Sequence, residues 1–192
     1  MISELIQLIV LFFVIFDPFA SFAVFSVATA KMNRAEKVKT ALYALLVASA
    51  LSLAVLVFGS ELLELFNTTI KEFSIAGGII LGILGIKMAL GHSLTDIEKL
   101  KNDSGMAIAA IIGTPLLTGP AAISAIIISV QNNGMLLTGT AVAFVLVIAG
   151  ILLLLSDFIT KILGKTLIQI TSTILGLITL SWGVKFIFSG LA

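Results

Sequence analysis

Two short stretches decide how this chain folds: Asp17-Pro18-Phe19-Ala20-Ser21, and Thr114-Pro115-Leu116-Leu117-Thr118-Gly119-Pro120. Each interrupts a long apolar run with a residue that can cap a helix, followed directly by proline. Proline suits the first position of a helix, but in a helix interior it removes a backbone hydrogen bond. Gly119-Pro120 adds a further break to the second stretch. We therefore predict two long apolar helices that are each broken near the middle.

The composition around these stretches is that of a membrane protein. Of the 192 residues, 59% are hydrophobic and 11% are charged, and the mean hydropathy is +1.24. Soluble domains carry about 25% charged residues. The chain has no cysteine and a single histidine, His92, so we expect no disulfide, no metal site, no cofactor and no enzymatic nucleophile–base pair. Basic residues are spread between the apolar runs, which argues against nucleic-acid binding.

Six apolar runs are long enough to cross a bilayer. A helix of about 20 apolar residues spans the hydrocarbon core, and only a helix satisfies its own backbone there. We therefore predict an all-α integral membrane protein with one domain over residues 1–192. The six expected transmembrane helices are Leu5–Ala30, Thr40–Phe58, Phe73–Gly91, Met106–Val130, Leu136–Leu155 and Ile168–Phe188.

The predicted loops differ in charge from one side of the membrane to the other. The second and fourth loops contain one basic residue, Lys71, whereas the first, third and fifth contain eight: Lys31, Arg34, Lys37, Lys39, Lys99, Lys101, Lys161 and Lys165. Short loops rich in lysine and arginine stay in the cytoplasm. We therefore expect a multi-pass protein of the cell membrane with both termini outside.

The two halves of the chain resemble each other. Asp17-Pro18 precedes Thr114-Pro115 by 97 residues, and a constant shift of 98 residues relates three positions of the third span to three of the sixth. These pairs are Gly78 and Gly176, Gly85 and Gly183, and Lys87 and Lys185. We infer two repeats, about 1–95 and 104–192, joined by a polar hinge over His92–Ser104. Three spans per repeat make the repeats inverted, a plan of secondary transporters.

The breaks are the candidate substrate site. Half-helices that start at Pro18 and Pro115 would bring their N-termini together near the midplane, where free N–H groups favour an anion. The carbonyls freed before each proline are acceptors for an ammonium group, so the site suits a zwitterion. Asp17 is the only acid deep inside a span, which makes it a candidate proton carrier, and a purely structural helix cap remains the alternative. We interpret Lys87 and Lys185 as reaching lipid headgroups.

The two stretches also resemble known motifs. Residues 17–25, Asp-Pro-Phe-Ala-Ser-Phe-Ala-Val-Phe, are similar to the first-helix motif Asp-Pro-x-Gly-Asn-x-Pro-x-Phe of the MarC/SnatA family. Residues 115–120 match its second motif, Pro-Leu-x-x-Gly-Pro, in full. The first motif departs at Ala20, Ser21 and Ala23. The resemblance implies six spans, the cytoplasmic membrane, and transport of small neutral amino acids such as glycine and alanine, with proton coupling.

Our leading hypothesis is a proton-coupled secondary transporter that works by alternating access. The alternatives are a passive channel for small solutes or ions, which would need a continuous polar lining, and a structural partner protein, in which a buried Asp17 would be an unexplained cost. The coupling ion, the transport direction and a homo-oligomeric state stay open. The expected substrate-binding residues are Asp17, Pro18, Phe19, Ala20, Ser21, Thr114, Pro115, Leu116, Thr118, Gly119 and Pro120.

Overall fold

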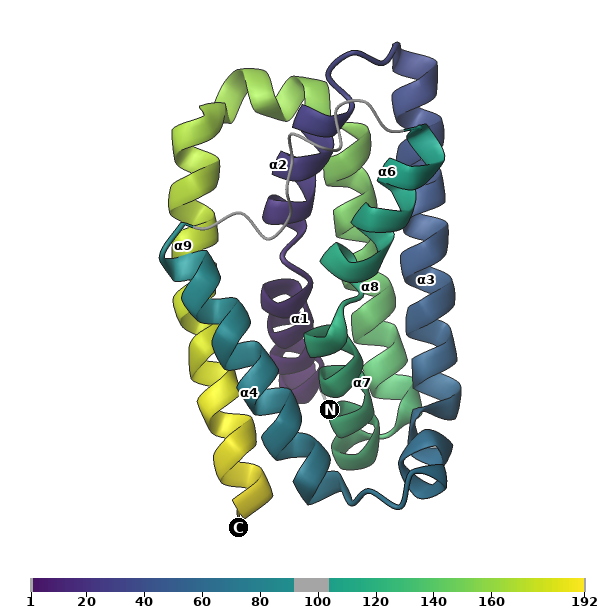
Figure 1. Cartoon of the computed structure of the whole chain (residues 1–192), viewed down its shortest axis with the longest axis vertical. Coiled ribbons are helices and arrows are strands. Elements are labelled where there is room, and N and C mark those ends of the chain that lie inside the picture. The colour runs from purple at the N-terminus through teal and green to yellow at the C-terminus, as the bar shows by residue number, and fades with distance from the viewer. Residues whose placement is uncertain (1, 92–103, 192) are drawn as a thin grey trace.

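The computed structural model describes residues 2–91 and 104–191, and all the regular elements in these two ranges are helices (Figure 1). Residues 92–103 of the predicted hinge, with Lys99 and Lys101, lie outside the described residues. The expected all-α class is therefore confirmed for the part of the chain that the structure describes.

The first apolar run forms two helices, α1 (Ile2–Phe16) and α2 (Pro18–Ala28). The break falls at Asp17, as the Asp-Pro pair predicts, and Pro18 takes the first position of α2. A short turn then leads into α3 (Arg34–Leu65), whose 32 residues include basic residues expected in the first loop. Helix α4 (Ile70–Ala89) follows. Both α3 and α4 begin with a capping box, in which the cap residue and a glutamate exchange hydrogen bonds.

The fourth apolar run is divided twice. It forms α6 (Gly105–Ile111), a π-helical segment η1 (Ile112–Leu117) and α7 (Pro120–Asn133). Thr114 is extended, with φ −149° and ψ 120°, because the residue before a proline is pushed out of the helical region. The backbone nevertheless resumes a helical path, and the next half-helix begins at Pro120. Our expectation that it begins at Pro115 is corrected accordingly.

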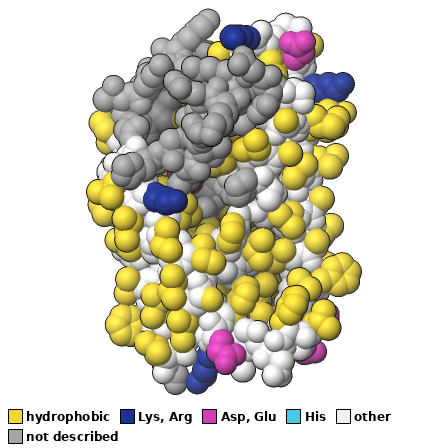
Figure 2. Space-filling model, viewed as in Figure 1, with side chains coloured by type: hydrophobic (Ala, Val, Ile, Leu, Met, Phe, Trp, Pro, Cys, Tyr) yellow, Lys and Arg dark blue, Asp and Glu magenta, His cyan; other side chains and the backbone are white. Residues whose placement is uncertain are grey.

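The last two helices are α8 (Met135–Leu154) and α9 (Ser156–Leu191). The backbone is helical through residues 161–165, so the predicted fifth loop is part of α9. In the described ranges, five helical segments are long and apolar enough to cross a membrane. They are Ile2–Ala28, Arg34–Leu65, Ile70–Ala89, Met135–Leu154 and Thr173–Leu191. Figure 2 shows apolar side chains over much of the part of one face that belongs to the described residues, as expected for an integral multi-pass membrane protein.

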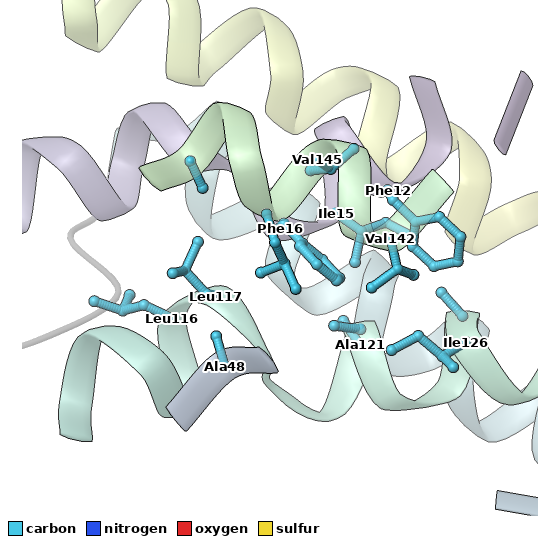
Figure 3. Packing of buried hydrophobic residues seen from close by; sticks show 14 of the residues in the cluster. Phe12, Ile15, Phe16, Ala48, Leu116, Leu117, Ala121, Ile126, Val142 and Val145 are labelled. Carbon is cyan, nitrogen blue, oxygen red and sulfur yellow. The ribbon is translucent and has the colours of Figure 1, made fainter. Parts of the chain in front are cut away.

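The core lies where the broken helices meet α8. Phe12 and Phe16 of α1 are fully buried and point toward Val142 and Val145 of α8, while Ala121 and Ile126 approach from α7 (Figure 3). Phe22 and Phe25 of α2 are fully buried as well. The packed aromatic rings on both sides of Asp17 hold α1 and α2 in place, although the chain between them is not helical.

Helices α4 and α9 pack against each other through glycines. A Cβ atom on Gly78 would lie 2.6 Å from the carbonyl oxygen of Gly183, and one on Gly85 would lie 2.7 Å from that of Gly176. Only residues without side chains allow two helix backbones to approach so closely. The shift of 98 residues relates Gly78 to Gly176 and Gly85 to Gly183. It therefore converts the contact of Gly78 with Gly183 into the contact of Gly176 with Gly85. Figure 1 shows the two helices running in opposite directions.

Several further helix contacts also come in pairs that the shift of 98 residues relates. Helix α3 packs against α6 and α7, and α8 packs against α1 and α2. Likewise, α4 contacts α7, and α9 contacts α2. Helices α3 and α8 also contact each other. Each of these contacts has a counterpart under the shift of 98 residues, whereas the contact of α7 with α8 and that of α1 with α9 have no counterpart of similar size.

Candidate functional site

Asp17 lies at the break between α1 and α2 in the left-handed backbone region, with φ 38° and ψ 69°. Aspartate tolerates this region because its short side chain can bond to the local backbone. Its Oδ1 accepts a hydrogen bond from the Ala20 N–H at 3.1 Å, and its carbonyl oxygen accepts one from the Ser21 N–H at 3.1 Å. The residue is only 3% exposed. The sequence thus folds a carboxylate into the interior of the helix bundle.

Beside Asp17 lies a cavity of about 210 Å³. Its walls come from the break between α1 and α2, the segment around the start of α7, and one face of α4. Sites for drug-sized ligands measure roughly 300–1,000 Å³, so this one suits a smaller molecule. Its lining consists of Ile15, Asp17, Ala20, Ser21, Ile80, Ile83, Leu84, Lys87, Leu116, Gly119, Pro120, Ala121 and Ala122.

The start of α7 contributes backbone donors to this cavity. Gly119 caps the helix without a side-chain hydrogen bond, and Pro120 occupies the first helical position. The N–H groups of a first helical turn have no partner within the helix, and here the first turn includes Ala121 and Ala122, which line the cavity. The positive end of a 14-residue helix therefore lies on the wall of the cavity that also holds Asp17.

The structure brings together six of the expected site residues on the cavity wall: Asp17, Ala20, Ser21, Leu116, Gly119 and Pro120. Pro18 is buried at the start of α2, and the Phe19 ring lies edge-on to Phe13, 5.9 Å between centroids. Neither residue is part of the described lining. Residues from both helix breaks therefore line the same cavity, but some residues of the two motifs do not.

The two threonines of the second motif lie elsewhere. Thr114 is exposed, and Pro115 next to it belongs to η1. Thr118 is fully buried, and its hydroxyl donates to the Ala48 carbonyl oxygen at 3.3 Å and lies 3.2 Å from the Ser52 hydroxyl. Thr118 therefore joins the second break to α3, and it is not part of the described cavity wall.

Sequence reasoning missed the contribution of α4. Ile80, Ile83, Leu84 and Lys87 of this helix line the cavity. The sequence predicts that Lys87 reaches lipid headgroups, because it lies about one turn before the helix ends. Figure 1 shows this end of α4 about level with the break between α1 and α2. The sequence periodicity shows which residues share one face of a helix, but it does not show how high one helix end lies relative to another helix.

Chemically, the cavity offers a carboxylate, the Ser21 hydroxyl, free helix N–H groups and one ammonium group on otherwise apolar walls. Within the described ranges no three histidine, aspartate or glutamate residues are grouped so that they could hold a metal ion. The arrangement is suited to binding a small molecule that carries both charges.

Comparisons with known proteins agree with the membrane architecture. The family model for MarC family integral membrane proteins matches residues 2–192. The chain is 36% identical over 150 residues to a UPF0056 membrane protein of Buchnera aphidicola subsp. Baizongia pistaciae, covering 71% of this chain and 68% of that protein. It is 30% identical over 173 residues to the UPF0056 membrane protein YhcE of Escherichia coli K12, covering 85% and 80%. No solved structure matches the chain.

Proposed function

The chain belongs to the MarC family of integral membrane proteins, and we propose that it is a secondary transporter of small neutral amino acids of the glycine and alanine class. One observation carries this proposal. A small cavity holds a buried carboxylate at the break of one helix and, on its wall, the start of another helix that has no side-chain cap. Broken helices that meet around a site are a recurring feature of secondary transporters.

The charges of the cavity fit a zwitterion in one orientation. The ammonium group of the substrate would bind near the Asp17 carboxylate, since opposite charges attract strongly where water is scarce. The substrate carboxylate would bind near the N–H groups at the start of α7, where the cap, Gly119, carries no charge. The volume of about 210 Å³ and the small residues Ala20, Ser21 and Ala121 favour a substrate with a short side chain.

The proposal includes two inverted three-helix repeats as the moving parts. The reciprocal approach of Gly78 to Gly183 and of Gly85 to Gly176 supports this symmetry, because a two-fold axis requires that each such contact occurs twice. The matched contacts of α3 and α8 with the two broken helices support it as well. Rocking of one repeat against the other would expose the cavity to each side in turn.

Proton coupling is assigned to Asp17. Its carboxyl is buried, so neutralisation by a proton or by an ammonium group lowers the cost of moving it through the bilayer interior. We place the protein in the cell membrane, with the turn between α2 and α3 in the cytoplasm and both termini outside, as the distribution of lysine and arginine favours.

Counterflow in proteoliposomes separates a transporter from a passive channel. Vesicles that contain the protein are loaded with unlabelled alanine and diluted into a trace of labelled alanine. A carrier accumulates the label transiently, because outward-moving alanine returns the binding site to the outer face. A channel only equilibrates the label, and that result would replace the proposal with the channel hypothesis.

A further inference from the structure

We propose that Lys87 anchors the substrate carboxylate and thereby makes the cavity selective for amino acids over simple amines. This inference rests on the proposed function and adds a specificity-determining residue to it. Lys87 lines the same cavity as Asp17, from a different helix. It is also exposed, which places it at the rim of the cavity and not in its depth.

Without Lys87, the cavity would bind the ammonium group of a zwitterion strongly and its carboxylate only weakly. Asp17 provides a full negative charge for an ammonium group, whereas the start of α7 provides about half a positive charge from its dipole. A lysine ammonium adds a full positive charge with three hydrogen-bond donors. A substrate that carries a carboxylate gains attraction to this charge, and an analogue that lacks the carboxylate does not.

The repeat-related lysine shows what Lys87 does differently. The ammonium of Lys185 lies over the indole of Trp182, 4.3 Å from the ring centroid, and this cation–π contact holds it. Shifting Trp182 back by 98 residues leads to Leu84, which itself lines the cavity. Lys87 therefore has no aromatic ring at the corresponding position. Among the described residues, cation–π contacts are made by Lys39 and Lys185, whereas Lys87 lines the cavity.

Uptake kinetics test this role with a matched control. Lys87→Met should raise the KM for alanine about tenfold or more and should reduce the preference for alanine over alaninamide, which keeps the amine but lacks the carboxylate. Lys87→Arg should restore much of the affinity. Lys185→Met removes the repeat-related charge and should leave the KM within about twofold of wild type. Lys87→Met with wild-type KM and selectivity would overturn the inference and leave the transporter proposal standing.

A chemical measurement does not depend on transport. An amine-reactive ester is applied to the wild-type protein, and mass spectrometry follows its reaction at Lys87 and at Lys185. Propionate, which does not react with the ester, should slow the reaction at Lys87 and not at Lys185, and propionamide, which lacks the charge, should slow neither. This protection in a protein that moves no amino acid would retain the anion site and reject the proposed function. Equal reaction rates at Lys87 with and without propionate would overturn the inference.

Discussion

At the residue scale, Asp17 combines two properties that are rarely found together. Its backbone lies in the left-handed region, and its side chain caps α2 from the interior of the bundle. Asparagine shares both abilities, because it tolerates the left-handed region and is an equally good cap. Alanine has neither. The two substitutions therefore separate the shape of the break from its charge.

We predict that Asp17→Ala lowers the free energy of unfolding by about 2 kcal/mol, the sum of a lost cap and an unfavourable backbone conformation. Asp17→Asn should lower it by clearly less, because asparagine keeps the cap and the backbone conformation. Denaturant unfolding of the purified protein in detergent, followed by circular dichroism, measures both. If the two variants are destabilised equally, the charge and not the conformation holds this break together.

At the scale of elements, the close approach of α4 and α9 depends on individual glycines. A Cβ on Gly85 would lie 2.5 Å from the Leu180 nitrogen and 2.7 Å from the Gly176 oxygen, and backbone atoms cannot move aside as side chains do. Gly82, on the same helix, differs. The nearest atom to its added Cβ is the flexible end of Leu180, at 3.9 Å.

Gly85→Ala should therefore force α4 and α9 apart and destabilise the fold by about 1–3 kcal/mol, as overpacking does. Gly82→Ala is the matched control and should cost less than about 0.5 kcal/mol. Gly176→Ala, the reciprocal change, should resemble Gly85→Ala. Thermal unfolding in detergent ranks the three variants. A tolerated Gly85→Ala would show that these helices are farther apart than described.

The elements differ in how far the sequence predicts them. The break at Asp17 is predicted because aspartate and proline act locally, through a cap and a missing N–H. The start of α7 at Pro120 is not distinguished from Pro115 by such local rules, since both are prolines that follow small or capping residues. Tertiary packing selects Pro120 as the start of α7. The buried Thr118 hydroxyl bonds to the Ala48 carbonyl of α3, and the backbone of Thr118 leaves the helical region. Around Lys161 and Lys165 the sequence predicts a loop that does not form. The charged residues there indicate a break between apolar runs, whereas the backbone stays helical.

At the scale of the whole molecule, the site is the part that sequence reasoning reaches least. Asp17 and Gly119-Pro120 are found because they break helices. Lys87 is not found, because its place on the cavity wall depends on where α4 ends relative to the other helices. The internal shift of 98 residues makes Lys87 and Lys185 equivalent in sequence. It does not predict that Lys87 is the one on the wall of this cavity.

The orientation of the molecule gives a further prediction, which the absence of cysteine makes easy to test. Figure 1 shows the connection from α2 to α3 and that from α3 to α4 at opposite ends of the molecule. Exposed Ala30 and Phe66 lie at these two connections. In intact cells, a membrane-impermeant maleimide should label Phe66→Cys and not Ala30→Cys. Labelling of Ala30→Cys before the cells are lysed would reverse the proposed topology.

The central claim is coupled transport of a small amino acid through the Asp17 cavity, and its most direct test is uptake of labelled glycine and alanine into proteoliposomes with and without a pH gradient. We predict accumulation that requires the gradient in wild type and is abolished in Asp17→Asn, which keeps the helix cap but loses the carboxylate. Accumulation that survives in Asp17→Asn would leave Asp17 a structural role only. No flux of either amino acid by folded protein would contradict the account.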